Sequence, residues 1–389
     1  MCSICGIVGM NDRQLIKAMN DSMVYRGPDD QGYFSDDKLE FGHNRLSIID
    51  LSEKGHQPMH NEDKNVWVIF NGEIYNFIKL REKLAKTGHK FMSRTDTEVI
   101  IHAYEEFGES FLEKIDGMFS IALYDKKKRK VVLARDRIGV KPFYYAKFAD
   151  KFLFASEMKA LMRDNSLKME FNDYGLQDYF KFDRKSPIKS INELLPGHYL
   201  TISIKEDGIK ISGQIEYWRP NIKLLFYQDE AKVSSELGEL LKDSVKQRMV
   251  SDVPIALFFS GGIDSTILAF FAKKFHNNTL KAFTIGTKDR NEFEAAKRGC
   301  KALNLDYVPI LLDKDQIINI VPTAIYHLED FDPRNVELCI LSYFLAKASR
   351  EHGIKVVLCG EGADEIFCGY RDFFPDYFKG GGIQQKEFA

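Results

Sequence analysis

The spacing of hydrophobic residues changes at about residue 230, so the chain divides into two regions with different predicted architectures. In the first region, short apolar runs without a helical period predict strands at 66–70, 131–134 and 151–155. A helix is predicted to interrupt them at 97–107, with Asp96 as its cap and Gly108 as its stop. The first region is therefore expected to contain many strands and few helices.

After residue 230, predicted strands alternate with predicted helices. The strands are expected at 255–259, 282–285 and 355–358, and the helices at 234–249, 266–275, 291–303 and 336–350. Short strands that are apolar throughout, placed between helices, are typical of a buried parallel sheet. The stretch between the regions carries Lys, Gly and Asp without a clear period. We therefore predict a first domain at 2–205, a linker at 206–229 and a second domain at 230–389.

Composition agrees with two globular domains and narrows the range of partners. The chain has 389 residues, of which 44% are hydrophobic, and this length exceeds that of one ordinary domain. A net charge of -2 gives no sign of a nucleic acid or an anionic membrane as partner. No run is long enough to span a membrane, and the first residues lack the pattern of a signal peptide. Six irregularly spaced cysteines favour a reducing cytoplasm.

The residue after the initiator methionine is a cysteine, and this position has chemical consequences. Removal of Met1 is expected before so small a side chain, and it leaves Cys2 as the first residue. Its own α-amino group, with an ordinary pKa of about 8, then serves as a built-in base for the thiol. Asn71 and Gly72 offer a side-chain amide and a backbone N–H to an oxyanion. These are the groups that cleavage of a carboxamide requires.

Two charged residues extend this set to a candidate amino-acid site. Arg45 offers a planar fork for a carboxylate, and Asp96 offers a negative charge for an ammonium. Taken alone, each feature also fits a simpler role: Asn71-Gly72 a turn, and Arg45 a structural cation. The pair Cys2 and Cys5 fits half of a metal site or a redox pair, although neither a second cysteine pair nor a βαβ unit follows. The combination favours release of ammonia from glutamine.

These residues belong to a series of stretches that match a known family. The stretches lie at 2–9, 26–30, 43–50, 56–58, 70–76, 93–98, 116–119 and 134–142. On them, the region from 2 to about 200 resembles the class II glutamine amidotransferase domain. That family has an α+β N-terminal-nucleophile hydrolase fold, which is an αββα sandwich. The resemblance implies that Cys2 is the nucleophile, that Asn71 and Gly72 are the oxyanion donors, and that glutamine is bound by Arg45, Ile49, Asn71, Glu73 and Asp96.

A second cysteine also begins a stretch of the same type. Cys5-Gly6-Ile7-Val8-Gly9 resembles a family start that would require removal of the residues before Cys5. We prefer Cys2 as the nucleophile, because only methionine removal is needed and because the apolar spacing after it fits.

The second region contains a glycine-rich loop between a predicted strand and a predicted helix. Its sequence is Ser260-Gly261-Gly262-Ile263-Asp264-Ser265. The two glycines let backbone N–H groups approach a phosphate, and the helix N-terminus adds positive potential. Ser260 and Ser265 can donate hydrogen bonds, and Asp264 can hold Mg²⁺. The simpler interpretation is a tight turn, and the spacing is not that of a Walker A loop. The strand, the aspartate and the serines favour a phosphate site.

An acidic loop follows the last predicted strand, with the sequence Gly360-Glu361-Gly362-Ala363-Asp364-Glu365. It is expected at the same carboxyl edge of the sheet as the glycine-rich loop, where ligands bind in open α/β sheets. Asp364 is then a candidate second magnesium ligand, and Glu361 a candidate general base. The simpler interpretation is a solvated turn, and Glu365 is expected to be structural.

The glycine-rich loop, with 251–254 just before it, resembles the pyrophosphate loop of enzymes that adenylate a substrate. The order of the two regions resembles the B type of glutamine-hydrolysing asparagine synthetase over nearly the whole chain. The resemblance implies an α/β pyrophosphate-loop domain with a parallel sheet, a carbon–nitrogen ligase activity, and an internal tunnel for ammonia. It implies Mg²⁺ at Asp264 and Asp364, and ATP at Phe258, Ser260, Gly261, Gly262, Asp264, Ser265, Ile285, Cys359 and Gly360. The partners are then glutamine, aspartate and ATP, and a homodimer is possible by analogy.

Two departures from that family keep other functions open. The chain ends at Ala389, soon after Tyr370, whereas the family's second domain continues, and the tail 380–389 resembles a frayed end. Glu337 falls where the family is expected to carry an arginine for the substrate carboxylate. One alternative is therefore an amidotransferase that acts on a carboxylate other than aspartate. Another is a shortened chain that only hydrolyses glutamine or only binds a partner.

Overall fold

The computed structural model describes residues 1–172, 186–222, 229–367 and 369, and these form two compact units. The first unit comprises Met1–Tyr227 together with Glu329–Asp332, and the second comprises Gln228–Leu328 and Pro333–Ala389. Four residues from the later part of the sequence therefore belong to the first unit. The predicted frayed tail at 380–389 lies outside the described residues.

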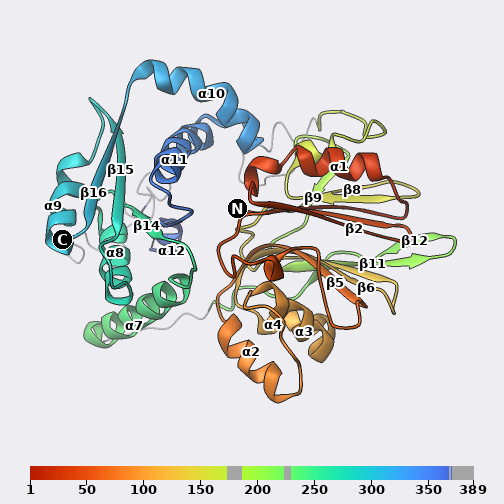
Figure 1. Ribbon diagram of the computed structural model, residues 1–389. Helices are drawn as coiled ribbons and strands as arrows, with labels where there is room; N and C mark the ends of the chain where they lie inside the picture. Colours follow the sequence, from red (N-terminus) through yellow and green to blue (C-terminus); the bar gives the residue numbers. More distant parts are fainter. Residues whose placement is uncertain (173–185, 223–228, 368, 370–389) are drawn as a thin grey trace. The chain divides into compact units, whose positions relative to one another are not determined.

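Two antiparallel sheets form the centre of the first unit (Figure 1). The first sheet has the order β10-β8-β9-β1-β3-β2, with the bounds β1 Ser3–Val8, β2 Asp30–Asp36, β3 Leu39–Arg45, β8 Tyr144–Lys147, β9 Phe152–Ala155 and β10 Ile191–Glu193. The second has the order β12-β11-β7-β6-β5-β4, with β13 also paired to β11. Its bounds are β4 Met59–His60, β5 Val66–Ile74, β6 Gly117–Asp125, β7 Lys130–Arg135, β11 His198–Lys205, β12 Gly208–Ile211 and β13 Ile215–Glu216.

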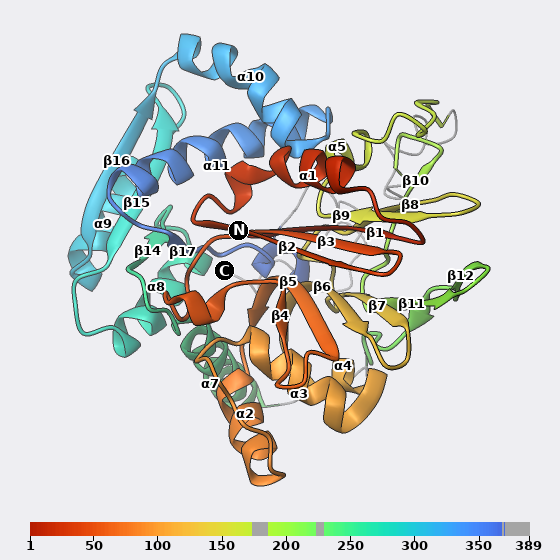
Figure 2. The ribbon, with the colours of Figure 1, turned by 45° about the vertical axis from the view of Figure 1, so that its right-hand side comes forward.

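Helices cover the outer faces of both sheets, which gives the four layers of an αββα sandwich (Figures 1 and 2). The helices are α1 Arg13–Asp21 and α5 Met158–Leu161 on the first sheet, and α2 Phe77–Lys86, α3 Thr97–Phe107 and α4 Phe111–Lys114 on the side of the second. One core of buried residues, including Phe41 and Phe154 from the first sheet and Ile69 and Leu133 from the second, joins the inner faces. The predicted αββα sandwich is confirmed.

The predicted linker at 206–229 differs from the structure in its first part. The strands β12 and β13 lie within this segment, and both pair with β11 of the first unit. Ile209 and Ile211 pack against the central core, so these residues belong to the sheet. The weak period arises because β12 is an edge strand of four residues, in which Lys210 is the exposed one.

The second unit contains one parallel sheet of four strands in the order β16-β15-β14-β17. The bounds are β14 Ile255–Phe258, β15 Lys281–Thr287, β16 Asp306–Leu312 and β17 Val356–Leu358. Its helices are α7 Glu230–Arg248, α8 Ile263–Phe275, α9 Phe293–Leu303, α10 Lys314–Leu328, α11 Pro333–Glu351 and α12 Ala363–Phe367. The predicted parallel α/β sheet is confirmed, and β16 and α10 are elements that the hydrophobic pattern did not reveal.

The predicted helix at 97–107 agrees with α3, but its cap differs from the prediction. Gly108 ends the helix with a φ of 58°, as a glycine stop permits. Asp96 precedes the helix but makes no capping hydrogen bond through its side chain. Its carboxylate instead accepts a hydrogen bond from the backbone N–H of Ile74, 2.9 Å away in the neighbouring strand. Within the described part of the chain, we find no helix long and apolar enough to cross a membrane.

Candidate active sites

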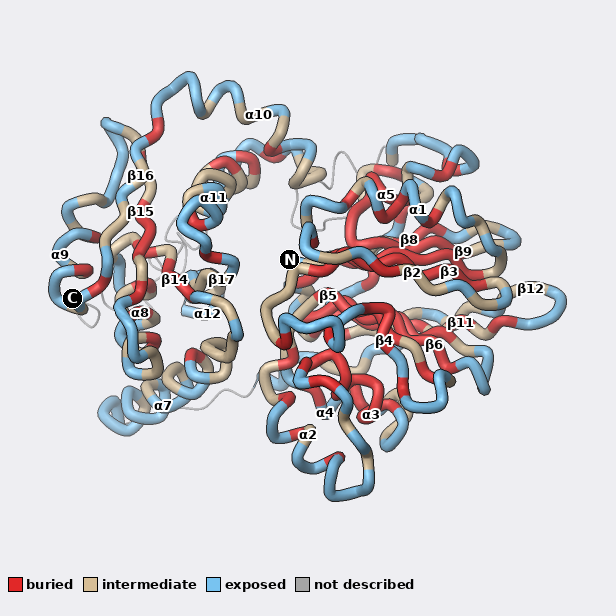
Figure 3. Tube along the Cα trace, in the orientation of Figure 1, coloured by how far each residue is buried: buried red, intermediate tan, exposed pale blue. Residues whose placement is uncertain are grey.

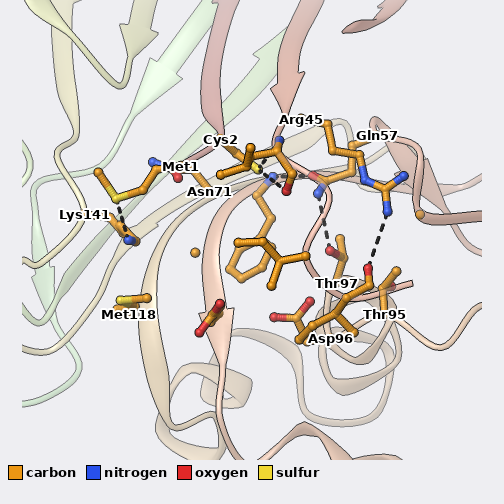
Figure 4. A pocket seen from close by; sticks show the side chains of 17 residues that line it. Met1, Cys2, Arg45, Gln57, Asn71, Thr95, Asp96, Thr97, Met118 and Lys141 are labelled. Carbon is orange, nitrogen blue, oxygen red and sulfur yellow. Dashed lines mark hydrogen bonds between the residues drawn. The ribbon is translucent and has the colours of Figure 1, made fainter. Parts of the chain in front are cut away.

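A cavity at the end of strand β5 brings together most of the site residues predicted in the first unit. Its volume is about 80 Å³, and it lies between the residues just before β1 and residues from β3, β5, β6 and the start of α3 (Figure 4). The predicted residues that line it are Cys2, Arg45, Ile49, Asn71, Gly72, Glu73 and Asp96. Segments that are far apart in sequence, such as those of Cys2 and Asp96, therefore converge on one small polar pocket.

The two candidate nucleophiles, Cys2 and Cys5, have different surroundings. Cys2 lies just before β1, borders the cavity, and its Sγ accepts a hydrogen bond from the backbone N–H of Leu46 at 3.3 Å. Cys5 is fully buried within β1 on the face toward α1, where its thiol lies 3.7 Å from the carbonyl of Gly42. Burial raises the pKa of both thiols. A substrate in the cavity would reach Cys2 and not Cys5.

Asn71 and Gly72 lie within a regular strand, so the interpretation of this pair as a turn does not apply. Asn71 pairs with Ser120 and Gly72 with Phe119 across β5 and β6. The carboxamide of Asn71 is buried, and neither its Nδ2 nor its Oδ1 has a hydrogen-bond partner among the described residues. Burial of an amide without a hydrogen-bond partner costs free energy, and this cost is removed when a ligand supplies the missing partner.

Gly72 is required by close packing of the two strands. A Cβ atom at this position would lie 2.0 Å from the carbonyl oxygen of Met118 on the neighbouring strand. A larger side chain would push the strands apart and would move Asn71 away from the cavity.

The guanidinium of Arg45 already holds part of the cavity wall. It is 7% exposed, and it donates to the carbonyl oxygens of Ser52 at 3.1 Å and Asp50 at 2.5 Å. The segment around Asp50 is also tied to the turn before α3, because the carboxylate of Asp50 accepts a hydrogen bond from the N–H of Arg94 at 2.8 Å. Arg45 therefore shapes the 49–52 loop while its positive charge faces the cavity.

Asp96 places a buried carboxyl group in the same cavity. Burial raises its pKa to about 6, although its hydrogen bond from Ile74 and the charge of Arg45 favour the ionised form. A cationic ligand group would satisfy this carboxylate, because opposite charges in a buried site stabilise each other strongly.

The cavity also contains residues to which the sequence motifs gave no role. Lys141 lies in it, and burial lowers its pKa; its ammonium lies 2.9 Å from the sulfur of Met1. Gln57 accepts a hydrogen bond from the N–H of Phe70 at 2.7 Å and donates to Thr97 at 3.3 Å. Both residues belong to stretches that resemble the family, at 56–58 and 134–142, and this was the available signal.

Met1 itself lines the cavity beside Cys2. Burial lowers the pKa of its terminal amine to about 6. Loss of Met1 would enlarge the space next to the thiol and would place the amine of Cys2 there.

In the second unit, the glycine-rich loop joins β14 to α8, as predicted. Gly261 has a φ of 81°, and a Cβ there would lie 2.7 Å from the backbone of Ala295. The Ser260 hydroxyl accepts from the N–H of Gly262 at 3.2 Å and lies 3.1 Å from the Ser265 hydroxyl. The loop is thus a compact turn whose last residues begin a 13-residue helix.

The acidic loop lies beside this turn, because β14 and β17 are neighbours in a parallel sheet. A Cβ on Gly360 would lie 3.2 Å from the Cβ of Asp264, so the loops touch. Phe258, Cys359 and Gly360 lie at this carboxyl edge, Ile285 lies within β15, and Glu361 is exposed. Asp364 lies in the first turn of the short α12. The structure therefore brings the two predicted loops together.

Glu337 does not stand alone at its position. It lies in α11, and its carboxylate pairs with the guanidinium of Arg290 at 3.3 Å, although both side chains are mostly exposed. Glu337 therefore has a cation beside it, and the predicted departure from the family at this position stays a prediction.

Comparisons with known proteins agree with the geometry of both units. Residues 1–218 match the glutamine amidotransferase domain, and residues 236–384 match asparagine synthase. The chain is 38% identical over 385 residues to the glutamine-hydrolysing asparagine synthetase 1 of Bacillus subtilis. The matched region covers 94% of this chain and 59% of that relative. It is 36% identical over 402 residues to synthetase 2 of the same organism, with 95% and 52% covered.

A plant protein gives the same result. The glutamine-hydrolysing asparagine synthetase of Zea mays is 32% identical over 388 residues, with 96% of this chain and 61% of the relative covered. The chain thus spans between half and two thirds of the length of these relatives. The matched domains, their order and the identities establish that this chain belongs to the family of glutamine-hydrolysing asparagine synthetases.

Proposed function

We propose that the protein is a glutamine-dependent asparagine synthetase. The reaction is ATP + L-aspartate + L-glutamine + water to AMP + diphosphate + L-asparagine + L-glutamate, through a β-aspartyl-AMP intermediate. The observation that carries the proposal is the unpaired amide of Asn71, buried beside Cys2 in a polar cavity. The glycine-rich loop 260–265 and the acidic loop 360–365, which lie side by side in the second unit, would carry out the second half of the reaction.

In the first half, the chain's own residues release ammonia from glutamine. After removal of Met1, the amine of Cys2 accepts the thiol proton, and the thiolate attacks the side-chain carbonyl carbon of glutamine. The Nδ2 of Asn71 and the N–H of Gly72 donate to the oxyanion that forms. Ammonia leaves with the proton from the amine, and water then hydrolyses the thioester to give glutamate.

The remaining cavity residues bind the two charged ends of glutamine. Arg45 faces the α-carboxylate, and Asp96 binds the α-ammonium, with Glu73 and Ile49 beside them. The charges are of opposite sign to those of the ligand, and their burial makes each interaction stronger than it would be in water.

In the second half, the carboxyl edge of the parallel sheet binds ATP. Phe258 and Ile285 border the adenosine, the loop 260–265 cradles the pyrophosphate, and Cys359 and Gly360 complete the site. Glu361 acts as general base when ammonia attacks the acyl-adenylate, since its carboxylate accepts the proton that nitrogen loses.

Mg²⁺ fits the residues at this edge. Carboxylate oxygens are the ligands that magnesium prefers, and Asp264 lies next to Gly360 of the loop that carries Asp364. We propose that Asp264 and Asp364 hold the ion, which would neutralise charge on the ATP phosphates. A cytoplasmic location agrees with the six dispersed cysteines, and a homodimer rests on family analogy.

The test is a single incubation of the purified 389-residue protein with ATP, Mg²⁺, glutamine and aspartate. Glutamate, asparagine and AMP are quantified together. Asparagine equal to AMP supports the synthetase. Glutamate without asparagine or AMP rejects it and leaves a glutaminase, whereas AMP formation that requires a different carboxylate identifies another acceptor.

A further inference from the structure

Two histidines and a glutamate converge on the outer side of the first unit, separate from the glutamine cavity. His89 lies in the connection between α2 and α3, and His102 and Glu105 lie one turn apart on α3. Their ligand-type atoms all lie within 4.8 Å of one another. The Oε2 of Glu105 lies 2.8 Å from the Nδ1 of His102 and 3.6 Å from the Nδ1 of His89. Three atoms that could bind a metal ion therefore lie close together.

The second nitrogen or oxygen atom of each of these side chains contacts a residue outside the cluster. The Nε2 of His89 lies 3.2 Å from Glu106, and the Nε2 of His102 lies 3.8 Å from Glu98. The Oε1 of Glu105 accepts a hydrogen bond from Asn61 at 2.6 Å. Carboxylates behind histidine ligands and a hydrogen bond behind a carboxylate ligand are the usual outer support of metal sites.

We propose that the Nδ1 atoms of His89 and His102 and the Oε2 of Glu105 bind a divalent transition-metal ion of the zinc class. Two imidazoles and one carboxylate suit zinc, with a water molecule as fourth ligand. Bonds of roughly 2.0–2.2 Å in a tetrahedral site separate ligand atoms by roughly 3.3–3.6 Å. The distances of 2.8 and 3.6 Å to Glu105 Oε2 lie near this range, so small side-chain movements suffice.

The burial of the set supports a specific site over a chance surface cluster. His102 is 1% exposed, and its ring packs against those of His89 and Phe91, with centroids 4.9 and 4.7 Å away. These contacts fix its orientation before any ion binds. The partly exposed carboxylate of Glu105 leaves a route by which an ion can enter.

The same side chains form an ion-pair network without a metal. The Nδ1 of His102 and the Oε2 of Glu105 lie 2.8 Å apart, so an ion that binds both atoms must displace any proton that they share. Zinc then replaces the His102–Glu105 hydrogen bond and adds His89 as a third ligand.

The proposed ion would stabilise the segment that carries Asp96. Glu98, behind His102, accepts hydrogen bonds from the backbone N–H groups of Met92 and Ser93 at 2.6 and 2.7 Å. This turn leads directly into Asp96 and the start of α3. A ligand that binds only the folded state raises its stability by mass action, so zinc should raise the melting temperature of the first unit.

The experiment uses the tag-free full-length protein after chelator treatment, titrated with Zn²⁺ by calorimetry and with Co²⁺ by visible absorption. His89→Ala and Glu105→Gln each remove one ligand, and neither residue is fully buried. His198→Ala is the matched control, because His198 lies on β11, away from this cluster, and its side chain lies 2.7 Å from the nearby carbonyl of Pro196. Circular dichroism confirms that each variant is folded.

The expected result is one Zn²⁺ per chain, with Co²⁺ bands of tetrahedral intensity. Affinity should fall at least roughly tenfold in His89→Ala and Glu105→Gln and should be unchanged in His198→Ala. The proposal is overturned if the wild-type protein binds no zinc, or if the two ligand variants bind it as tightly as the control. These measurements do not depend on synthetase or glutaminase activity.

Discussion

The two candidate sites of this protein differ in how far the chain alone completes them. The glutamine cavity is enclosed by buried residues from several strands, and the buried amide of Asn71 there has no hydrogen-bond partner among the described residues. The candidate ATP site of the second unit consists of two loops at the carboxyl edge of the sheet, where Glu361 and Cys359 are exposed. The first site is therefore built largely from buried side chains, whereas the second presents exposed residues of two loops.

The same contrast appears in the helices. Eight of the eleven residues of α3 are buried, whereas Val245 is the single buried residue among the 19 of α7 (Figure 3). Burial of apolar surface is the main source of stability, so the first unit is expected to be the more stable. The predictions below test this difference between the buried site of the first unit and the more exposed site of the second.

The largest effect is expected at the nucleophile. Cys2→Ala removes the attacking sulfur and should lower glutamate release on the order of 10⁴-fold or more, because no other group can form the thioester. The melting temperature should change little, since the side chain of Cys2 is only partly buried and lies outside strand β1. Cys5→Ala is the matched control. Near-normal activity is expected in it, and loss of activity in Cys5→Ala but not in Cys2→Ala would reverse our choice of nucleophile.

A smaller loss is expected at the oxyanion donor. Asn71→Ala should lower kcat for glutamine hydrolysis roughly 10²–10³-fold with little change in KM, because the donor acts mainly in the transition state. The variant should also be slightly more stable, since a buried amide without a partner has been removed. Steady-state kinetics and thermal unfolding check the two outcomes. A change confined to KM would contradict the assigned role.

The third effect concerns the buried carboxylate. Asp96→Asn should raise the KM for glutamine roughly 10–100-fold, because a charge-assisted contact with the ammonium is lost. In the wild type, the KM should rise as the pH falls through about 6, where Asp96 becomes protonated. A KM that stays constant from pH 7.5 to 5.5 would reject the assignment.

The raised pKa of Asp96 also fixes the sign of a stability effect. A carboxyl group whose pKa is higher when folded favours folding at low pH, and this contribution is lost as the pH rises from about 4 to about 6. Asp96→Asn should therefore stabilise the first unit by up to about 3 kcal/mol at pH 7.5 and not at pH 4. Denaturant unfolding at both pH values measures the difference.

The last prediction concerns the stability of the second unit and no catalytic step. Gly261→Ala introduces both a positive φ and a contact of 2.7 Å with the backbone of Ala295, and it should cost about 2–4 kcal/mol. Gly353→Ala is the control, since its φ is 72° but its Cβ would meet open space, and about 1–2 kcal/mol is expected. Calorimetry should show a lower first transition in Gly261→Ala and an unchanged second one. Equal effects of the two substitutions would contradict close packing at the loop.

Local sequence was sufficient where one physical rule controls the structure. The apolar run before Ser260 predicted a buried parallel strand, and Gly108 predicted the end of α3, because no long-range contact competes with these rules. The segment 208–216 was misassigned, since its strands are specified by pairing with β11 and not by their own pattern.

The site residues divide in the same way. Chemistry-bearing motifs identified Cys2, Arg45, Asn71 and Asp96, but they did not reveal that Asp96 bonds to Ile74 in place of capping its helix. The roles of Lys141 and Gln57 in the cavity depend on contacts between distant strands, and no local pattern encodes such contacts.

The sequence by itself determined the two fold classes and the order of the units, and it predicted the chemistry of both sites, because these follow from short motifs and hydrophobic periods. Only the tertiary structure decided which atoms face each other: the unpaired amide of Asn71, the convergence of His89 with Glu105, and the placement of Glu329–Asp332 in the first unit. The physical reason is that burial and contact between distant segments depend on how the whole chain packs.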